Sequence, residues 1–162
     1  MRLRPRKSAR EHAVRLLPRL ARKFFRAGDR EVKPGAAPGR IHAFRIRTKR
    51  FRYSLEFFRR CYGQPLDSHL KRIKELQDSL GAVTDCWSTQ RLYHGTFPTA
   101  LVRSPKLRAA LDGRLTEMLA AACRHWSSTF QEVGLRQRML RYLGHPPVGS
   151  SRRTGRQRTR QR

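Results

Sequence analysis

The sequence predicts an all-α protein, an antiparallel four-helix bundle with long helices followed by a disordered basic C-terminal tail. Apolar residues recur at helical spacing in four segments, and no segment shows the two-residue alternation of a half-buried β-strand. Gly- and Pro-rich stretches separate the segments, as expected of helices joined by short loops. We therefore expect one helical domain over residues 8–143 and a disordered Arg-rich tail over residues 144–162.

The first helix is expected to begin at Ser8, because Ser8 and Glu11 have the spacing of a capping box. Its apolar residues at helical spacing are Ala13, Leu17, Leu20 and Phe24. Pro18 falls within this run, so the helix is either kinked there or restarts with Pro18 in its first turn. The stretch 27–40 is rich in Gly and Pro and is predicted to be a loop.

The second and third helices follow this loop. The second is predicted over residues 41–62, with Gly63 as its C-terminal stop. The third is predicted to begin near residue 67 and to end around residues 93–95. Gly81 inside it costs about 1 kcal/mol relative to alanine. A glycine kept at that cost indicates the close approach of a neighbouring helix or of a ligand.

A fourth helix is predicted to start at Ser104 and Pro105, a cap followed by proline in the first turn. Its buried face is expected to carry Leu107, Leu111, Leu115, Met118, Ala122 and Trp126. From Gly144 onward the chain consists largely of Pro, Gly, Ser and Arg, with six Arg and no acid after Ser150. This composition predicts the disordered tail.

The charge of the chain restricts its partners. It carries 38 Lys plus Arg residues against 11 Asp plus Glu, a formal net charge of +27. A domain with this charge repels itself, so polyanions are the expected partners: nucleic acid, polyphosphate or an anionic membrane surface. The sequence has no apolar run of about 18 residues, so no membrane insertion is expected. The three cysteines, widely spaced, are predicted to be reduced thiols of a cytoplasmic protein.

The second predicted helix carries a row of cations. At about 100° per residue, its basic side chains on one face are His42, Arg45, Lys49 and Arg52. The apolar strips that flank this row are Ile46, Tyr53 and Phe57 on one side and Phe44, Phe51, Leu55 and Phe58 on the other. Like charges at this spacing each cost about 0.2–0.5 kcal/mol, and a bound polyanion would remove that cost. We predict a cationic groove between two packing surfaces, and the alternative interpretation is a solvated basic face.

The third predicted helix contributes the opposite wall of this groove. Lys71 and Lys74 are expected to lie there. Asp78 and Asp85 share the face of Lys74 and are predicted to pair with cations of the second helix. Metal binding by this pair would need further carboxylates to converge on it, and no such set is expected, so no metal site is predicted.

The two central helices together resemble the CHAD (conserved histidine alpha-helical domain) family over residues 41–85. The residues of the second helix that match the family pattern are His42, Arg45, Ile46, Lys49, Arg50, Phe51 and Arg52. Those of the third helix are Lys74, Leu76, Gln77, Asp78, Leu80, Gly81 and Asp85. The resemblance implies a helical bundle whose basic groove binds inorganic polyphosphate. The contacts it implies are His42, Arg45, Lys49, Arg50, Arg52, Lys71 and Lys74.

Full-length members of that family usually contain two four-helix halves around one groove, whereas this chain has room for one half. The resemblance therefore implies either a homodimer that completes the groove or a shortened member of the family. It also implies association with polyphosphate granules in the cytoplasm as one location.

Other functions have weaker support in the sequence. Non-specific, weak nucleic-acid binding by the same basic face and by the Arg-rich tail is the main alternative. A zinc-finger spacing and an RNA-binding aromatic platform are both absent from the sequence. The chain also lacks a Glu-x-Glu motif, a Walker loop and a nucleophile grouped with a base. We therefore expect no catalytic residues, no cofactor and no enzymatic activity.

Overall fold

The computed structural model describes residues 7–97, 99 and 104–145. Over these residues the chain forms helices and their connections, without a β-strand. The α-helices are α1 (Ala9–Glu31), α2 (Pro38–Phe57), α3 (Pro65–Thr96), α5 (Pro105–Phe130) and α6 (Leu135–Gly144). The all-α prediction is confirmed. The prediction of four helices is wrong, because the described part of the chain contains five. The predicted tail lies outside the described residues from position 146 onward.

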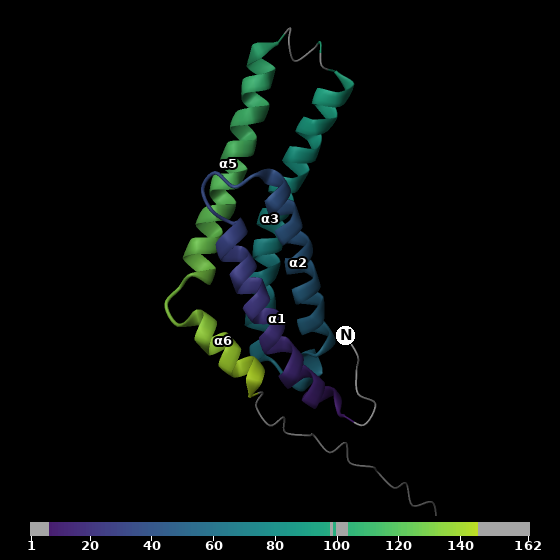
Figure 1. The fold of residues 1–162 in the computed structure, drawn as a ribbon, viewed down its shortest axis with the longest axis vertical. Helices are drawn as coiled ribbons and strands as arrows, with labels where there is room; N and C mark the ends of the chain where they lie inside the picture. The colour runs from purple at the N-terminus through teal and green to yellow at the C-terminus, as the bar shows by residue number, and fades with distance from the viewer. Residues whose placement is uncertain (1–6, 98, 100–103, 146–162) are drawn as a thin grey trace, which may run out of the picture.

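The helices form two regions (Figure 1). The body contains α1, α2, α6, the first part of α3 and the last part of α5. Beyond it, α3 and α5 continue as a pair, which we call the arm and define as residues 85–97 and 104–121. Both α3, with 32 residues, and α5, with 26, therefore pass from one region into the other.

An aromatic cluster forms the centre of the body. The Trp126 ring is fully buried and stacks on Phe130, with ring centroids 5.0 Å apart. Phe24 of α1 and Phe44 of α2 meet the same indole edge to face at 5.5 and 5.4 Å. The ring of Trp126 fills the space beside Gly28, where an added Cβ would lie 2.1 Å from two ring carbons. This glycine belongs to α1 and makes room for the tryptophan.

The loop between α1 and α2 is shorter than predicted, because Gly28 packs against Trp126 within α1. We expected a loop over residues 27–40, but α1 continues to Glu31 and α2 begins at Pro38. The predicted loop included Gly28, which is instead a packing residue within α1. The capping box of Ser8 and Glu11 is confirmed. Pro18 lies inside α1, which continues through it, so a restart at Pro18 is wrong.

The next two helix boundaries also differ. The second helix ends at Phe57 and is followed by a short 3-10 helix over Arg59–Cys61. Gly63 then reverses the chain with φ +69°, as its predicted role as a stop requires. The third helix begins at Pro65, two residues earlier than expected. At α5 the predicted Ser104 cap is confirmed, since its side chain accepts a hydrogen bond from the Leu107 amide.

The last predicted helix is divided by a turn. It ends at Phe130, and Gly134, with φ +79°, redirects the chain into α6. The buried residues of α6 are Leu135, Met139 and Leu143. α6 packs against α1, where the Arg136 guanidinium lies 5.0 Å from the centre of the Phe25 ring. The apolar repeat continues through the turn, so its period alone did not reveal the break.

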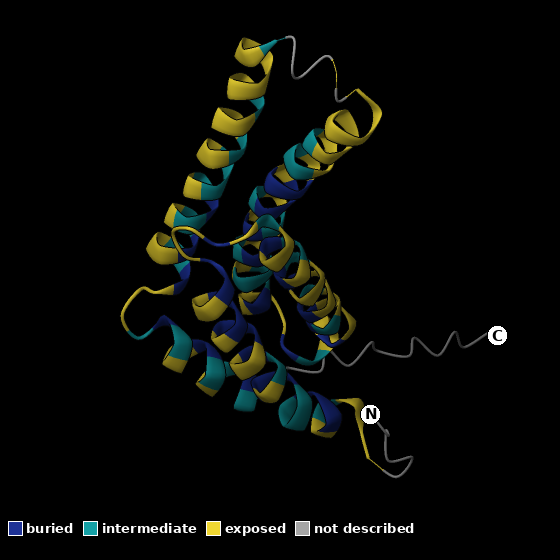
Figure 2. Cartoon of the chain, turned by 45° about the horizontal axis from the view of Figure 1, so that its top comes forward, coloured by how far each residue is buried: buried dark blue, intermediate teal, exposed yellow. Residues whose placement is uncertain are grey.

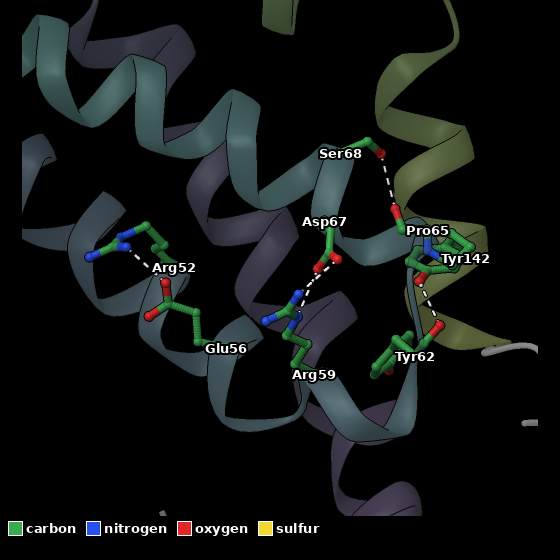
Figure 3. A network of polar contacts seen from close by, with 8 residues as sticks. All are labelled: Arg52, Glu56, Arg59, Tyr62, Pro65, Asp67, Ser68 and Tyr142. Carbon is green, nitrogen blue, oxygen red and sulfur yellow. Dashed lines mark hydrogen bonds and ion pairs between the residues drawn. The ribbon is translucent and has the colours of Figure 1, made fainter. Parts of the chain in front are cut away.

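Hydrogen bonds of two tyrosines join α6 to the base of the body. The buried Tyr62 hydroxyl donates a hydrogen bond of 2.7 Å to the Leu143 carbonyl. In return, the Tyr142 hydroxyl donates one of 3.1 Å to the Tyr62 carbonyl (Figure 3). Burial raises the pKa of both phenols, that of Tyr142 to about 12, so both remain donors at neutral pH. These reciprocal bonds join segments about 80 residues apart in the sequence.

Candidate functional site

One side of α2 is buried and the other is exposed. The buried residues are Ile41, Phe44, Thr48, Phe51 and Leu55. Thr48 occupies a core position because its hydroxyl donates to the Phe44 carbonyl of its own helix at 3.0 Å. The second predicted strip is different: Ile46, Tyr53 and Phe57 are 41%, 48% and 77% exposed. The prediction that α2 is wedged between two packing surfaces is therefore wrong, since its neighbours in the described part of the chain cover only one strip.

The cations of α2 lie beside α3. The Arg45 guanidinium is the neighbour of Gly81: an added Cβ would lie 3.7 Å from its Nε, an ordinary van der Waals contact, so the structure shows no approach close enough to require glycine. Closer to the base of the body, Nε of Arg52 donates to the side-chain oxygen of Gln77 at 3.0 Å. Both side chains are half-buried at the contact between the two helices. We call the surface that carries His42, Arg45, Lys49 and Arg52 of α2 along the edge of α3 the cationic face.

Only some cations of α2 are neutralised by carboxylates. Arg52 pairs with Glu56 at 2.8 Å (Figure 3), and Arg40 and Arg47 lie 3.5 and 3.9 Å from the buried carboxylate of Glu31. Within the described part of the chain, neither Arg45 nor Lys49 forms an ion pair with an acid. The centre of the cationic face therefore keeps its positive charge.

Two buried nitrogen atoms on this face have no hydrogen-bond partner in the described structure: Nδ1 of His42 and Nε of Arg45. A buried polar atom without a partner costs about 1–3 kcal/mol. Nε of Arg45 is always a donor, whereas Nδ1 of His42 donates only when it carries a proton. An anion at this position would supply an oxygen acceptor to either donor. Lys49, which is exposed, lies 5.7 Å from the centre of the Tyr53 ring, and Arg52 lies 4.9 Å from it. These distances are those of cation–π contacts, so the Tyr53 ring orients both cations.

The remaining predicted residues lie at different places. Lys74 is exposed on α3, three residues before Gln77, and its ammonium lies 3.9 Å from Asp78. The predicted pairing of Asp78 with a cation of α2 is therefore wrong, because Asp78 pairs along its own helix. Lys71 is also exposed on α3. Arg50 faces away from the cationic face.

Arg50 instead lines a separate cavity between α1 and α2. This cavity has a volume of about 410 Å³, and Lys23 and Arg47 also line it. The structure thus brings His42, Arg45, Lys49 and Arg52 together along one edge, with Lys71 and Lys74 on the neighbouring helix. It does not bring Arg50 to them.

Two residues of α3 that the sequence did not indicate lie at the same surface. The ring of Trp87 lies 6.4 Å from that of His42, and the guanidinium of Arg91 lies 5.2 Å from the centre of the same indole. These residues extend the cationic face beyond Gly81, past the segment that carried the family resemblance. Their spacing of four residues places both on one side of α3, and the register of α2 and α3 places that side beside His42.

Other kinds of site lack support in the described residues. No group of three His, Cys, Asp or Glu side chains among them is arranged to hold a metal ion. None of the described helices is long and apolar enough to cross a bilayer.

The fold and the site define a class: an all-helical protein with an incompletely neutralised cationic face between two antiparallel helices. A family model, described as CHAD domain, matches residues 2–94, more than half of the chain. The chain belongs to the CHAD family, and the resemblance seen in the sequence is confirmed. The match covers α1, α2 and nearly all of α3, whereas α5 and α6 lie outside it. Comparisons with curated proteins and with solved structures gave no match.

Proposed function

We propose that this protein binds inorganic polyphosphate on the cationic face. Membership of the CHAD family supports this ligand class. The observation that carries the proposal is the state of Arg45 and His42: each has a buried nitrogen without a partner, beside the unneutralised Lys49. A linear chain of phosphates offers one negative charge and several oxygen acceptors per unit, which matches a row of cations spaced along a helix.

The roles of the residues follow from their positions. Arg45 and His42 would donate hydrogen bonds to phosphate oxygens, and Lys49 would neutralise the adjacent unit. Arg52, held by Gln77 and Glu56, would form the end of the site nearest the base of the body. Lys71 and Lys74 would attract the chain from α3. Arg50 stays a predicted contact that requires the polymer to pass around α2.

A binding titration with a matched control tests the proposal. Arg45→Ala combined with Lys49→Ala removes two cations four residues apart on α2, and Arg22→Ala combined with Arg26→Ala removes two exposed cations at the same spacing on α1. Hydrogen bonds to charged groups contribute about 1.5–3 kcal/mol each. We therefore expect affinity for polyphosphate to fall by about 100-fold or more in the first variant and by less than about threefold in the second. Equal losses would mean that net charge alone binds the polymer.

The second candidate function is non-specific nucleic-acid binding, favoured by the six Arg after Ser150. Deletion of residues 146–162 separates the two. If the tail carries the function, its removal abolishes polyanion binding while the Arg45 and Lys49 substitutions leave it intact. Competition gives an independent answer: displacement of polyphosphate by single-stranded RNA or duplex DNA at equal phosphate concentration would favour nucleic acid.

We also propose that the protein is not an enzyme and acts in the cytoplasm, with polyphosphate granules as a place of association. Release of orthophosphate from polyphosphate by the pure protein would contradict the first statement. The homodimer that completes a groove also stays a prediction.

A further inference from the structure

The arm lacks a core of its own. Among the described residues of 85–97 and 104–121, none is buried, whereas α3 and α5 both bury several side chains within the body. Figure 2 shows this change along both helices, from dark blue in the body to yellow and teal in the arm. Helices in water are held mainly by the packing of an apolar face. Two long helices that leave every described side chain between them at least partly exposed therefore form an incomplete structure.

The exposed surface of the arm is apolar at several positions. Leu92 and Phe97 of α3 are 65% and 54% exposed, and Leu107 of α5 is 36% exposed. Between the two helices lies a cavity of about 480 Å³ at the base of the arm, lined by Cys86, Leu111 and Met118 among others. Higher in the arm, the Gln90 amide contacts Asp112 across the pair. The arm thus half-buries some apolar side chains, such as Leu115 and Met118, and leaves Leu92, Phe97 and Leu107 exposed.

The charge of the arm distinguishes it from the rest of the molecule. The arm, residues 85–97 and 104–121, carries four Lys plus Arg and three Asp plus Glu, a net charge of +1. The body, residues 7–84 and 122–145, carries 24 Lys plus Arg and eight Asp plus Glu, a net charge of +16. Two copies of the body repel each other strongly, whereas two arms do not. The exposed strip on α2 is unsuitable for self-association because its apolar residues alternate with Lys49, Arg50 and Arg52.

We propose that the arm is the interface of a homodimer, in which two arms pack about a twofold axis and form an intermolecular four-helix bundle. Leu92, Phe97 and Leu107 are the expected contacts. An antiparallel pairing of the arms places the two basic bodies at opposite ends, which minimises their repulsion, so this dimer differs from the groove-completing homodimer that the family resemblance implies. The C-terminal tail is not the occupant of this surface, because it contains no apolar residue after Val148.

Sedimentation equilibrium of the full chain, without polyphosphate, tests this interface. We expect a dimer for the natural sequence and a monomer, with a dissociation constant raised at least 100-fold, for Leu92→Lys combined with Phe97→Lys. The matched control is Phe57→Lys, which changes a side chain of α2 that is 77% exposed and should leave the dimer intact. None of these three side chains is buried, so circular dichroism should report unchanged helicity in both variants.

Cys86 provides an independent measurement. It lines the cavity at the base of the arm, whereas Cys61 lies in the body. Alkylation of Cys86, followed by peptide mass spectrometry, should slow at least tenfold as protein concentration rises through the dissociation constant, with Cys61 unaffected. A monomer at all concentrations, or dissociation by Phe57→Lys but not by the arm variant, would overturn the proposal. Because polyphosphate is absent from both measurements, failure of the proposed binding function would not alter these outcomes.

Discussion

The body and the arm are built from the same two helices, yet only the body has a core. Within the body, α3 buries Ile73, Leu76 and Leu80, and α5 buries Trp126 and Phe130. Past residue 84 on α3 and before residue 122 on α5, the described part of each helix buries nothing. The helical period continues across the boundary, so amphipathicity is present in both regions. What differs is the presence of α1, α2 and α6, which supply the opposing surface.

The largest expected contrast comes from truncating one apolar side chain of α5 in each region. Trp126→Ala should lower the free energy of unfolding by about 3–5 kcal/mol, because it empties the centre of the aromatic cluster. Leu107→Ala on the arm should cost less than about 1 kcal/mol in dilute protein. Urea denaturation followed by circular dichroism measures both. Similar losses at the two positions would show that the arm has a core after all.

Two glycines, one in each region, test the same difference. Replacement by alanine should lower the free energy of unfolding at one of them and raise it at the other. Gly28→Ala forces a methyl group into the Trp126 ring and should destabilise the body by about 1–3 kcal/mol. Gly113→Ala, inside α5 on the arm, meets nothing within 4 Å and should stabilise the helix by up to about 1 kcal/mol. Thermal unfolding of the two variants beside the natural sequence measures the signs. A destabilising Gly113→Ala would reveal a neighbour of the arm.

The smallest expected effect is a pH dependence of the free energy of unfolding that arises from a histidine in the body. Burial, aided by Arg72, lowers the pKa of His69, whose ring lies 5.4 Å from that of Tyr142. The unfolded chain therefore binds a proton at this residue more readily than the folded chain does. Stability should fall as the pH drops below about 6.5, the ordinary pKa of histidine. Denaturation at pH 7 and pH 5 should show a smaller loss for His69→Gln than for the natural sequence, and an equal loss would contradict this account.

Periodicity predicted the helices more reliably than it predicted their ends. The Ser8 and Ser104 caps are confirmed because capping depends on residues within one turn. Gly28 and Gly134 show the limit of local reasoning. The first looks like a breaker but serves a tryptophan almost 100 positions later, and the second breaks an apolar repeat that continues past it. The choice between these roles depends on tertiary packing, which a local pattern does not contain.

The sequence predicted the row of cations on α2, but it did not predict their ion pairs or all of the residues that α3 adds to the surface. The helical angle grouped His42, Arg45, Lys49 and Arg52, and the structure keeps them along one edge. The helical angle did not indicate which carboxylates neutralise which cations. Glu31 was expected in the loop 27–40, whereas it ends α1 and lies beside Arg40 and Arg47. The contributions of Trp87 and Arg91 required the antiparallel register of α2 and α3, which places residue 42 opposite residue 87.

The contact between α1 and α6 has a consequence for synthesis of the chain. α1 emerges from the ribosome before all the other described helices, and α6, which covers part of it, emerges after them. The hairpin of α2 and α3 is complete long before then, since its partners are close in sequence. Until residue 143 has emerged, Tyr62 has no Leu143 carbonyl to which it can donate. The nascent protein thus carries a partly uncovered first helix through most of its translation, and closure of the body waits for its last ten helical residues.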